Sequence, residues 1–118
     1  MTTNEAAFAN AAEWLANASR LVVFTGAGVS AESGIPTFRD QLTGFWAKFD
    51  PAQLATSIAF RNDPALVWGW YEWRRAQVAL ARPNAAHVAI AALMQHVPEL
   101  VVVTQNVDDL HERAGSKD

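Results

Sequence analysis

Two short segments of the chain carry the residue types that could bind a nucleotide. The first has the spacing Gly-x-Gly-x-x-Ala, a form of the dinucleotide fingerprint, and consists of Gly26, Ala27, Gly28, Val29, Ser30 and Ala31. We expect Gly26 to take a positive φ in a tight turn, and Gly28 to let backbone N–H groups approach a phosphate closely. Ala31 would keep the following helix near the preceding strand. The alternative is a plain strand-to-helix turn without a ligand.

The second segment places polar side chains directly after an apolar run. Gln105, Asn106 and Asp108 follow Leu100–Val103. Ligands of open α/β sheets bind at the carboxyl ends of the strands, where such side chains can hydrogen-bond ribose hydroxyls and a carboxamide. The alternative is an Asx turn leading into the next helix, above all for Asp109.

Apolar runs and capping signals outline the elements that position these segments. We predict strands at 21–24 and 100–103, each buried on both faces. Helices are predicted at 4–18, after the glycine turn, from Asp50-Pro51, and at 64–81, 85–96 and 108–113. Strands separated by helices imply a parallel pair with a right-handed crossover.

The predicted fold class is therefore α/β, a partial Rossmann-like open parallel sheet with helices on both faces. A parallel sheet of two strands is unusually small, so this sheet is interpreted as incomplete. We interpret residues 1–118 as the front portion of a larger domain. The usual second strand, ending in an acidic residue about 20 positions after the glycines, is replaced by an aromatic loop, which argues against an ordinary dehydrogenase.

Composition excludes several classes of function. The 118 residues carry a net charge of −3, which argues against binding to nucleic acid. No cysteine is present, so disulfides and a cysteine zinc site are excluded within these residues. No apolar run approaches the roughly 18 residues of a membrane span, and no leader pattern is seen at the start. The expectation is a cytoplasmic protein without a membrane partner.

Separate motifs along the chain together resemble one enzyme family, the sirtuins, which are NAD-dependent protein lysine deacylases. They are Gly26–Ser30, Gly34-Ile-Pro-Thr-Phe-Arg39, Pro83-Asn-Ala-Ala-His87, Thr104-Gln-Asn-Val-Asp108 and Leu110-His-Glu-Arg-Ala-Gly115. The match runs in order from about residue 20 to the end of the chain. It corresponds to the N-terminal part of the family's NAD-binding catalytic domain.

The resemblance implies a role for each matched segment. The glycine turn would hold the NAD pyrophosphate, with the Ser30 hydroxyl near the phosphates. The mobile cofactor loop, which shapes the nicotinamide pocket, would include Ile35, Pro36, Thr37, Phe38 and Arg39. Asn106 and Asp108, with Gln105, would line the nicotinamide and ribose region and support catalysis. For Arg39 the alternative is a solvated loop charge.

Two parts of the family's machinery are not found in this sequence. The general-base histidine of sirtuins precedes a glycine, and no His-Gly pair occurs here; His87, His96 and His111 are interpreted as structural. The family's zinc module uses two pairs of cysteines and would lie after that histidine. The resemblance therefore implies zinc only in a missing C-terminal part, and a fragment that is inactive alone.

A pair of residues on the helix over 64–81 suggests which acyl group is removed. Tyr71 and Arg74 are spaced i, i+3 on one face, where an arginine among aromatic side chains needs an anionic partner if it is buried. A carboxylate on the acyl group could serve. The pattern resembles the sirtuins that remove succinyl, malonyl and glutaryl as well as acetyl groups. The alternative is that Arg74 extends into water.

The sequence therefore predicts NAD-dependent removal of acetyl, and of succinyl or malonyl, groups from lysines of protein partners, giving nicotinamide and O-acyl-ADP-ribose. Two alternatives stay open: a stand-alone NAD- or ADP-ribose-binding regulatory module, and an ADP-ribosyltransferase. The sequence does not specify an oligomeric state.

Overall fold

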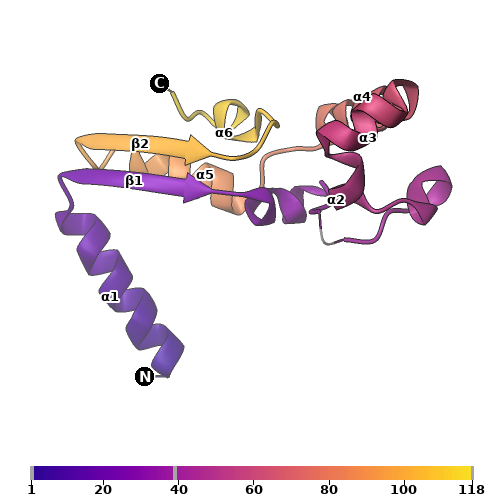
Figure 1. Cartoon of the computed structure of the whole chain (residues 1–118). Helices are drawn as coiled ribbons and strands as arrows, with labels where there is room; N and C mark the ends of the chain where they lie inside the picture. Colours follow the sequence, from indigo (N-terminus) through magenta and orange to yellow (C-terminus); the bar gives the residue numbers. More distant parts are fainter. Residues whose placement is uncertain (1, 39, 118) are drawn as a thin grey trace.

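The computed structural model describes residues 2–38 and 40–117 and shows a small parallel sheet joined to a lobe of helices (Figure 1). In chain order the elements are α1 (Thr3–Asn17), β1 (Arg20–Thr25), the 3-10 helices η1 (Ala27–Ser33) and η2 (Gly44–Lys48), α2 (Pro51–Leu54), α3 (Ser57–Asn62), α4 (Pro64–Leu80), α5 (Ala85–Leu93), β2 (Glu99–Thr104) and α6 (Leu110–Arg113). The predicted α/β class and the parallel pairing are confirmed. No helix in the described ranges is long and apolar enough to cross a membrane.

The register of the sheet brings the two functional segments to one edge. Arg20 pairs with Glu99 at the start of the strands, and Thr25 pairs with Thr104 at their end. The two threonine hydroxyls are hydrogen-bonded at 2.8 Å. Because parallel strands end at the same edge, the chain leaves β1 into the glycine turn beside the place where it leaves β2 into Gln105.

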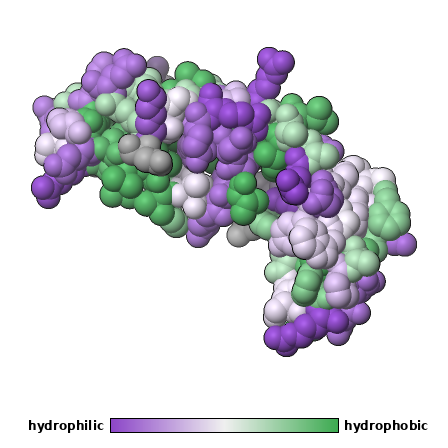
Figure 2. Space-filling model, turned by 90° about the horizontal axis from the view of Figure 1, so that it is seen from above, coloured by the Kyte–Doolittle hydropathy of each residue, from purple (hydrophilic) through white to green (hydrophobic). Residues whose placement is uncertain are grey.

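One face of the sheet is largely exposed, which corrects the prediction of strands buried on both faces. Successive side chains of a strand point to opposite faces, and the described elements cover only one of them. On the other face Val22 and Phe24 are each 65% exposed, and Val101 and Val103 are exposed beside them. Figure 2 shows hydrophobic surface, in green, gathered at the end of the molecule that holds the sheet.

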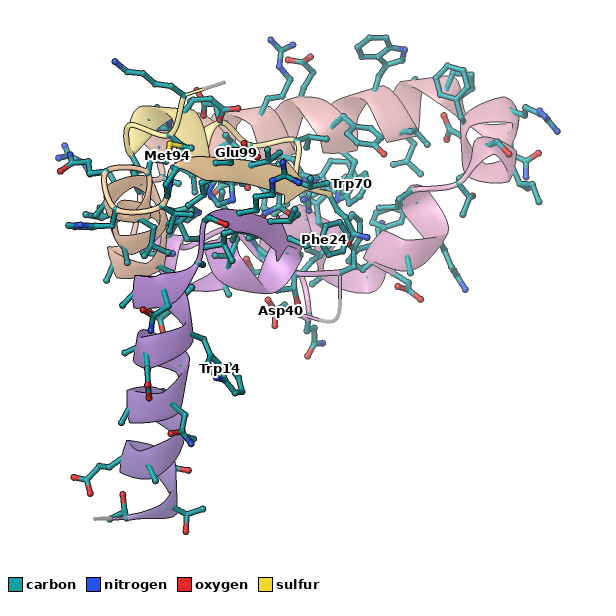
Figure 3. All side chains as sticks on the ribbon, turned by 90° about the vertical axis from the view of Figure 1, so that its left-hand side faces the viewer. Trp14, Phe24, Asp40, Trp70, Met94 and Glu99 are labelled. Carbon is teal, nitrogen blue, oxygen red and sulfur yellow. The ribbon has the colours of Figure 1, made fainter. Side chains whose placement is uncertain are left out.

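Helix α1 forms because of a strong local cap and gains little from packing. Thr2 and Glu5 make a reciprocal capping box, in which each side chain accepts from the other's backbone N–H. None of its residues is buried, and the helix extends away from the sheet (Figure 1). The Trp14 side chain is exposed (Figure 3). Its predicted span is confirmed to within one residue at each end.

The helical lobe has an aromatic core. Leu42, Trp46, Leu54 and Trp70 are buried together. The predicted caps are confirmed, since Asp50 accepts from the N–H of Ala52 and Asp63 from that of Leu66, each just before a proline. A second cluster connects the lobe to the sheet end of the molecule by packing Ile35, Ala81 and Leu110 together, with Val78 against them.

Candidate functional site

A cleft lies where the two strands end, and its walls come from distant parts of the sequence. The loop after η1, helix α4 and the segment after β2 surround a cavity of about 100 Å³. Its lining residues are Ala27, Ser30, Ile35, Pro36, Phe38, Tyr71, Arg74, Val78, Gln105, Asn106, Val107 and Asp108. Residues of the glycine turn and of the segment 105–108 therefore share one cleft, as their positions at strand ends predict.

The glycine turn has a different backbone from the one expected. Gly26 is extended, with φ −133° and ψ −165°, so the prediction of a positive φ there is wrong. A Cβ on Gly26 would lie 3.3 Å from Oε1 of Gln105, a tight contact that the end of this flexible side chain would have to relieve by a small shift. The left-handed residue is Gly34, with φ 88°, which ends η1. A Cβ on Gly28 would meet nothing within 4 Å, so this glycine faces open space that a ligand could approach.

Asn106 connects the segment after β2 to the glycine turn. Its Nδ2 group donates to the carbonyl oxygen of Gly26 at 2.9 Å, and its backbone N–H donates to Oγ1 of Thr104 at 3.1 Å. These bonds fix the orientation of the amide, because the nitrogen side faces the turn. The oxygen side is then the part of the amide that a bound molecule would meet.

Both carboxylate oxygens of Asp108 accept hydrogen bonds within the protein. One carboxylate oxygen accepts from the Ser30 hydroxyl at 2.9 Å, and the other accepts from the N–H of Leu110 at 3.1 Å. The second bond is the Asx-type contact that we considered for Asp109. Asp109 instead pairs with Arg113 at 2.9 Å. Ser30 is almost fully buried, so its hydroxyl donates to Asp108 from beneath the cleft.

Two buried histidines lie under the site, which sequence reasoning did not foresee. His87 is 0% exposed; its Nδ1 accepts from the backbone N–H of Asn84 at 3.1 Å, so the proton sits on Nε2, which lies 3.4 Å from the Ser30 hydroxyl. The ring centroids of His87 and His111 are 5.1 Å apart, and Nε2 of His111 is 2.9 Å from Oγ1 of Thr25. The spacing of Asn84 and His87 signals a capping box, but no sequence feature places that box against Ser30.

Burial sets the charge state of His87. Removal of the ring from water lowers the pKa of His87, the neighbouring His111 lowers it further, and the Asp108 carboxylate raises it in part. A neutral His87 donates from Nε2 toward Ser30, whose hydroxyl donates in turn to Asp108. The hydrogen bonds therefore form a chain in which His87 donates to Ser30 and Ser30 donates to the Asp108 carboxylate at the cleft.

Tyr71 and Arg74 stand on the opposite wall, on one face of α4, as predicted. Both also line an adjoining groove of about 440 Å³, together with Arg75, Val78, Ala79, Val107, Asp109 and Arg113. The guanidinium carbon of Arg74 lies 5.0 Å from the Phe38 ring centroid and 5.1 Å from that of Trp70. Its Nη1 is buried without a hydrogen-bond partner among the described residues.

The surroundings of Arg74 disfavour its charge. Desolvation lowers the pKa of the Arg74 guanidinium, while Tyr71 and the Asp108 carboxylate raise it in part. The residue is half-buried and its Nη1 atom is buried, which argues against the alternative that Arg74 extends into water. A half-buried cation with an unused donor can accept an anionic group from a ligand.

Only some of the remaining predicted site residues line the cavity. Ile35, Pro36 and Phe38 line the cavity, whereas Gly26, Gly28, Ala31 and Thr37 are not among its lining residues. The Thr37 N–H donates to a carboxylate oxygen of Asp40 at 2.7 Å. Arg39 lies outside the described residues. In the described ranges no group of three metal-binding side chains is placed to hold a metal ion.

Comparison with known proteins gives consistent matches. The profile of the Sir2 family matches residues 26–118. The NAD-dependent protein deacylase 1 of Pseudomonas aeruginosa is 70% identical over 106 residues, which are 90% of this chain and 42% of that protein. The NAD-dependent protein deacylase of Methylococcus capsulatus is 66% identical over 104 residues, 88% of this chain and 41% of that protein.

Solved structures of similar proteins have the same fold. A crystal structure of a Sir2 homologue in complex with NAD superposes with a TM-score of 0.83 at 50% identity, covering 93% of this chain and 43% of that one. A mutant Sir2 homologue in complex with 2'-O-acetyl ADP ribose also gives 0.83 at 50% identity, covering 92% and 43%. The chain thus spans about two fifths of the length of the relatives that it matches.

Proposed function

Because the chain belongs to the Sir2 family, the sirtuins, we propose that it forms the NAD-binding side of an NAD-dependent protein lysine deacylase. The observation that supports this most strongly is the shared cleft, in which the glycine turn meets Asn106 and Asp108. Residues 1–118 would be the N-terminal part of the catalytic domain. The general-base histidine and a zinc module would then belong to other parts of the protein, since His87 and His111 are buried and already hydrogen-bonded.

The residues of the cleft fit the parts of NAD. The open space beside Gly28 would admit the pyrophosphate, and backbone N–H groups of the turn would donate to it. The Oδ1 side of Asn106 and the Asp108 carboxylate would orient the nicotinamide carboxamide and the ribose hydroxyls. NAD, when bound, supplies a nicotinamide–ribose bond whose cleavage lets the ribose carbon take the acyl oxygen.

The protein groups act on this chemistry by positioning and by exclusion of water. Phe38, Ile35 and Val107 present apolar surface to the cavity, which strengthens electrostatic contacts inside it. Ser30 and His87 hold the Asp108 carboxylate from below, so that it needs no rearrangement when a ligand binds. The acyl-lysine of a protein substrate would enter beside α4.

We further propose a preference for acyl groups that end in a carboxylate, such as succinyl or malonyl. The unused Nη1 donor of Arg74 and the hydroxyl of Tyr71 lie along one wall of the cleft and of the adjoining groove. A carboxylate there would neutralise a cation that lies against the Phe38 and Trp70 rings and whose Nη1 has no hydrogen-bond partner among the described residues.

The test uses the full-length natural protein, NAD, and peptides with acetyl- or succinyl-lysine. The expected products are nicotinamide, the free lysine peptide and O-acyl-ADP-ribose, separated by mass spectrometry. Binding of ADP-ribose without turnover of either peptide would favour the regulatory module. Attachment of labelled ADP-ribose to protein without deacylation would favour the transferase, and no interaction with NAD or ADP-ribose would contradict the proposal as a whole.

A further inference from the structure

The side chain of Arg113 connects the two walls of the cleft. From α6 it donates with Nη1 to the carbonyl oxygen of Ala81 at 2.8 Å and with Nη2 to that of Val78 at 2.9 Å. Its Nε donates to the Asp109 carboxylate at 2.9 Å. One guanidinium therefore holds the C-terminal end of α4 and the residue that follows Asp108.

The acceptors at the end of α4 make this contact specific to arginine. The last carbonyl groups of a helix have no partner within the helix and carry the negative end of its dipole. Nη1 of Arg113 meets the Ala81 carbonyl, just after the helix, and Nη2 of the same planar fork meets the Val78 carbonyl, which also accepts from the Ala81 N–H at 3.2 Å. A lysine offers a single ammonium group and cannot reproduce this fork together with the contact to Asp109.

The contact lies on the same side of α4 as the pair that faces the cleft. Tyr71, Arg74 and Val78 follow one another at i, i+3 and i+7, and all three line both the cavity and the groove. At about 1.5 Å per residue, Arg74 is only about one helical turn from the carbonyl that Arg113 holds. A shift of the end of α4 would therefore move Arg74 relative to Asp108.

We propose that Arg113 is a positioning residue that sets acyl selectivity by fixing the distance between α4 and the segment 106–109. This proposal rests on the proposed deacylase function. Arg113 lines only the groove and not the cavity that holds Asn106, so it acts through α4 and not through contact with the cofactor. Its loss should widen the acyl end of the cleft and weaken recognition of a carboxylate, which depends on geometry more than recognition of a methyl group does.

The test compares full-length wild type with Arg113→Met, Arg113→Lys and the control Arg20→Met. Arg20 lines neither the cavity nor the groove, and its charge is paired with Glu99 on the exposed surface at the start of the strands. For Arg113→Met we expect kcat/KM for the succinyl peptide to fall about tenfold more than for the acetyl peptide, because a misplaced binding group costs on this order. KM for NAD should stay within about twofold.

The lysine variant and the control sharpen the result. Arg113→Lys should recover part of the succinyl preference, and Arg20→Met should keep all of it. An unchanged succinyl-to-acetyl ratio in Arg113→Met, or equal losses with both peptides, would overturn the proposal.

A second measurement separates this proposal from the proposed function. Amide hydrogen exchange at Leu80 and Ala81, at the end of α4, should be faster in Arg113→Met by about tenfold and unchanged in Arg20→Met, as expected when the helix end loses its contact. If the wild type deacylates neither peptide, the proposed function fails, and exchange alone decides whether Arg113 positions α4. Unchanged exchange at these amides overturns the proposal whatever the activity is.

Discussion

The two walls of the cleft differ in whether their buried polar side chains have hydrogen-bond partners within the protein. Beneath the glycine turn, Ser30, His87, Asn106 and Asp108 are joined by hydrogen bonds to one another or to the backbone. On the α4 wall, Arg74 has an unused buried donor and is held by aromatic rings. The first wall is built to keep its own geometry, whereas the second wall is left ready for a partner of opposite charge.

This difference predicts opposite effects on stability and on binding. Removal of one member of a satisfied buried network leaves its partners unpaired, which destabilises the fold. Removal of a half-buried cation with no partner relieves a desolvation cost, so the fold should be unharmed while ligand recognition is lost. The substitutions below, made in the full-length protein, test this contrast.

The largest effect on the fold is expected from Asp108→Ala. It takes the acceptor from the buried Ser30 hydroxyl and from the N–H of Leu110, and it should lower the free energy of unfolding by about 2–3 kcal/mol. Urea denaturation measures the change, with Glu32→Ala as an exposed control expected within about 0.5 kcal/mol of wild type. A loss as small as that of the control would contradict the view that this wall is a connected network.

Arg74→Met should separate recognition from stability. We expect kcat/KM for a succinyl peptide to fall about 10- to 100-fold, the scale of one charge-assisted hydrogen bond, with a change of less than about threefold for the acetyl peptide. The urea midpoint should stay the same or rise. Equal losses with both peptides, or a clear drop in the midpoint, would remove the contrast between the walls.

Asn106→Ala tests a residue that has a structural hydrogen bond and a proposed role in ligand binding. Loss of its bond to the Gly26 carbonyl should cost about 1 kcal/mol of stability. Release of nicotinamide should slow about tenfold or more, because the amide no longer orients the substrate. Rapid-quench measurement of nicotinamide checks the second effect, and unchanged release would take Asn106 out of the site.

The smallest effect concerns pH and His87. Because burial lowers the pKa of His87, the unfolded chain binds a proton at this residue more readily than the folded chain does near its ordinary pKa of 6.5. Stability should therefore fall as the pH drops below about 6.5, by at most about 1.4 kcal/mol per pH unit from this group. Urea midpoints at several pH values should show a flatter profile for His87→Gln than for wild type; parallel profiles would mean that His87 does not titrate in this way.

Local features were predictable where a residue and its near neighbours settle the outcome. Interactions within a few positions determine the N-caps at Asp50 and Asp63, the strand predicted at 21–24 and the common face of Tyr71 and Arg74. Predictions failed where the answer depended on distant atoms. Gly26 is extended, and its carbonyl accepts from Asn106, which is distant in the sequence. The exposure of Val22 follows from the absence of cover among the described residues.

The sequence alone determined the family, the α/β class and the identity of the two segments that meet at the strand ends, because motif spacing and apolar runs are properties of the chain itself. Tertiary structure decided which polar groups are satisfied. Ser30 with His87, Asn106 with Gly26 and Arg113 with α4 are joined across more than thirty positions of sequence. Hydrogen bonding and desolvation act over a few ångströms, so only the folded arrangement determines that Ser30, Asn106 and Asp108 have partners while Nη1 of Arg74 has none among the described residues.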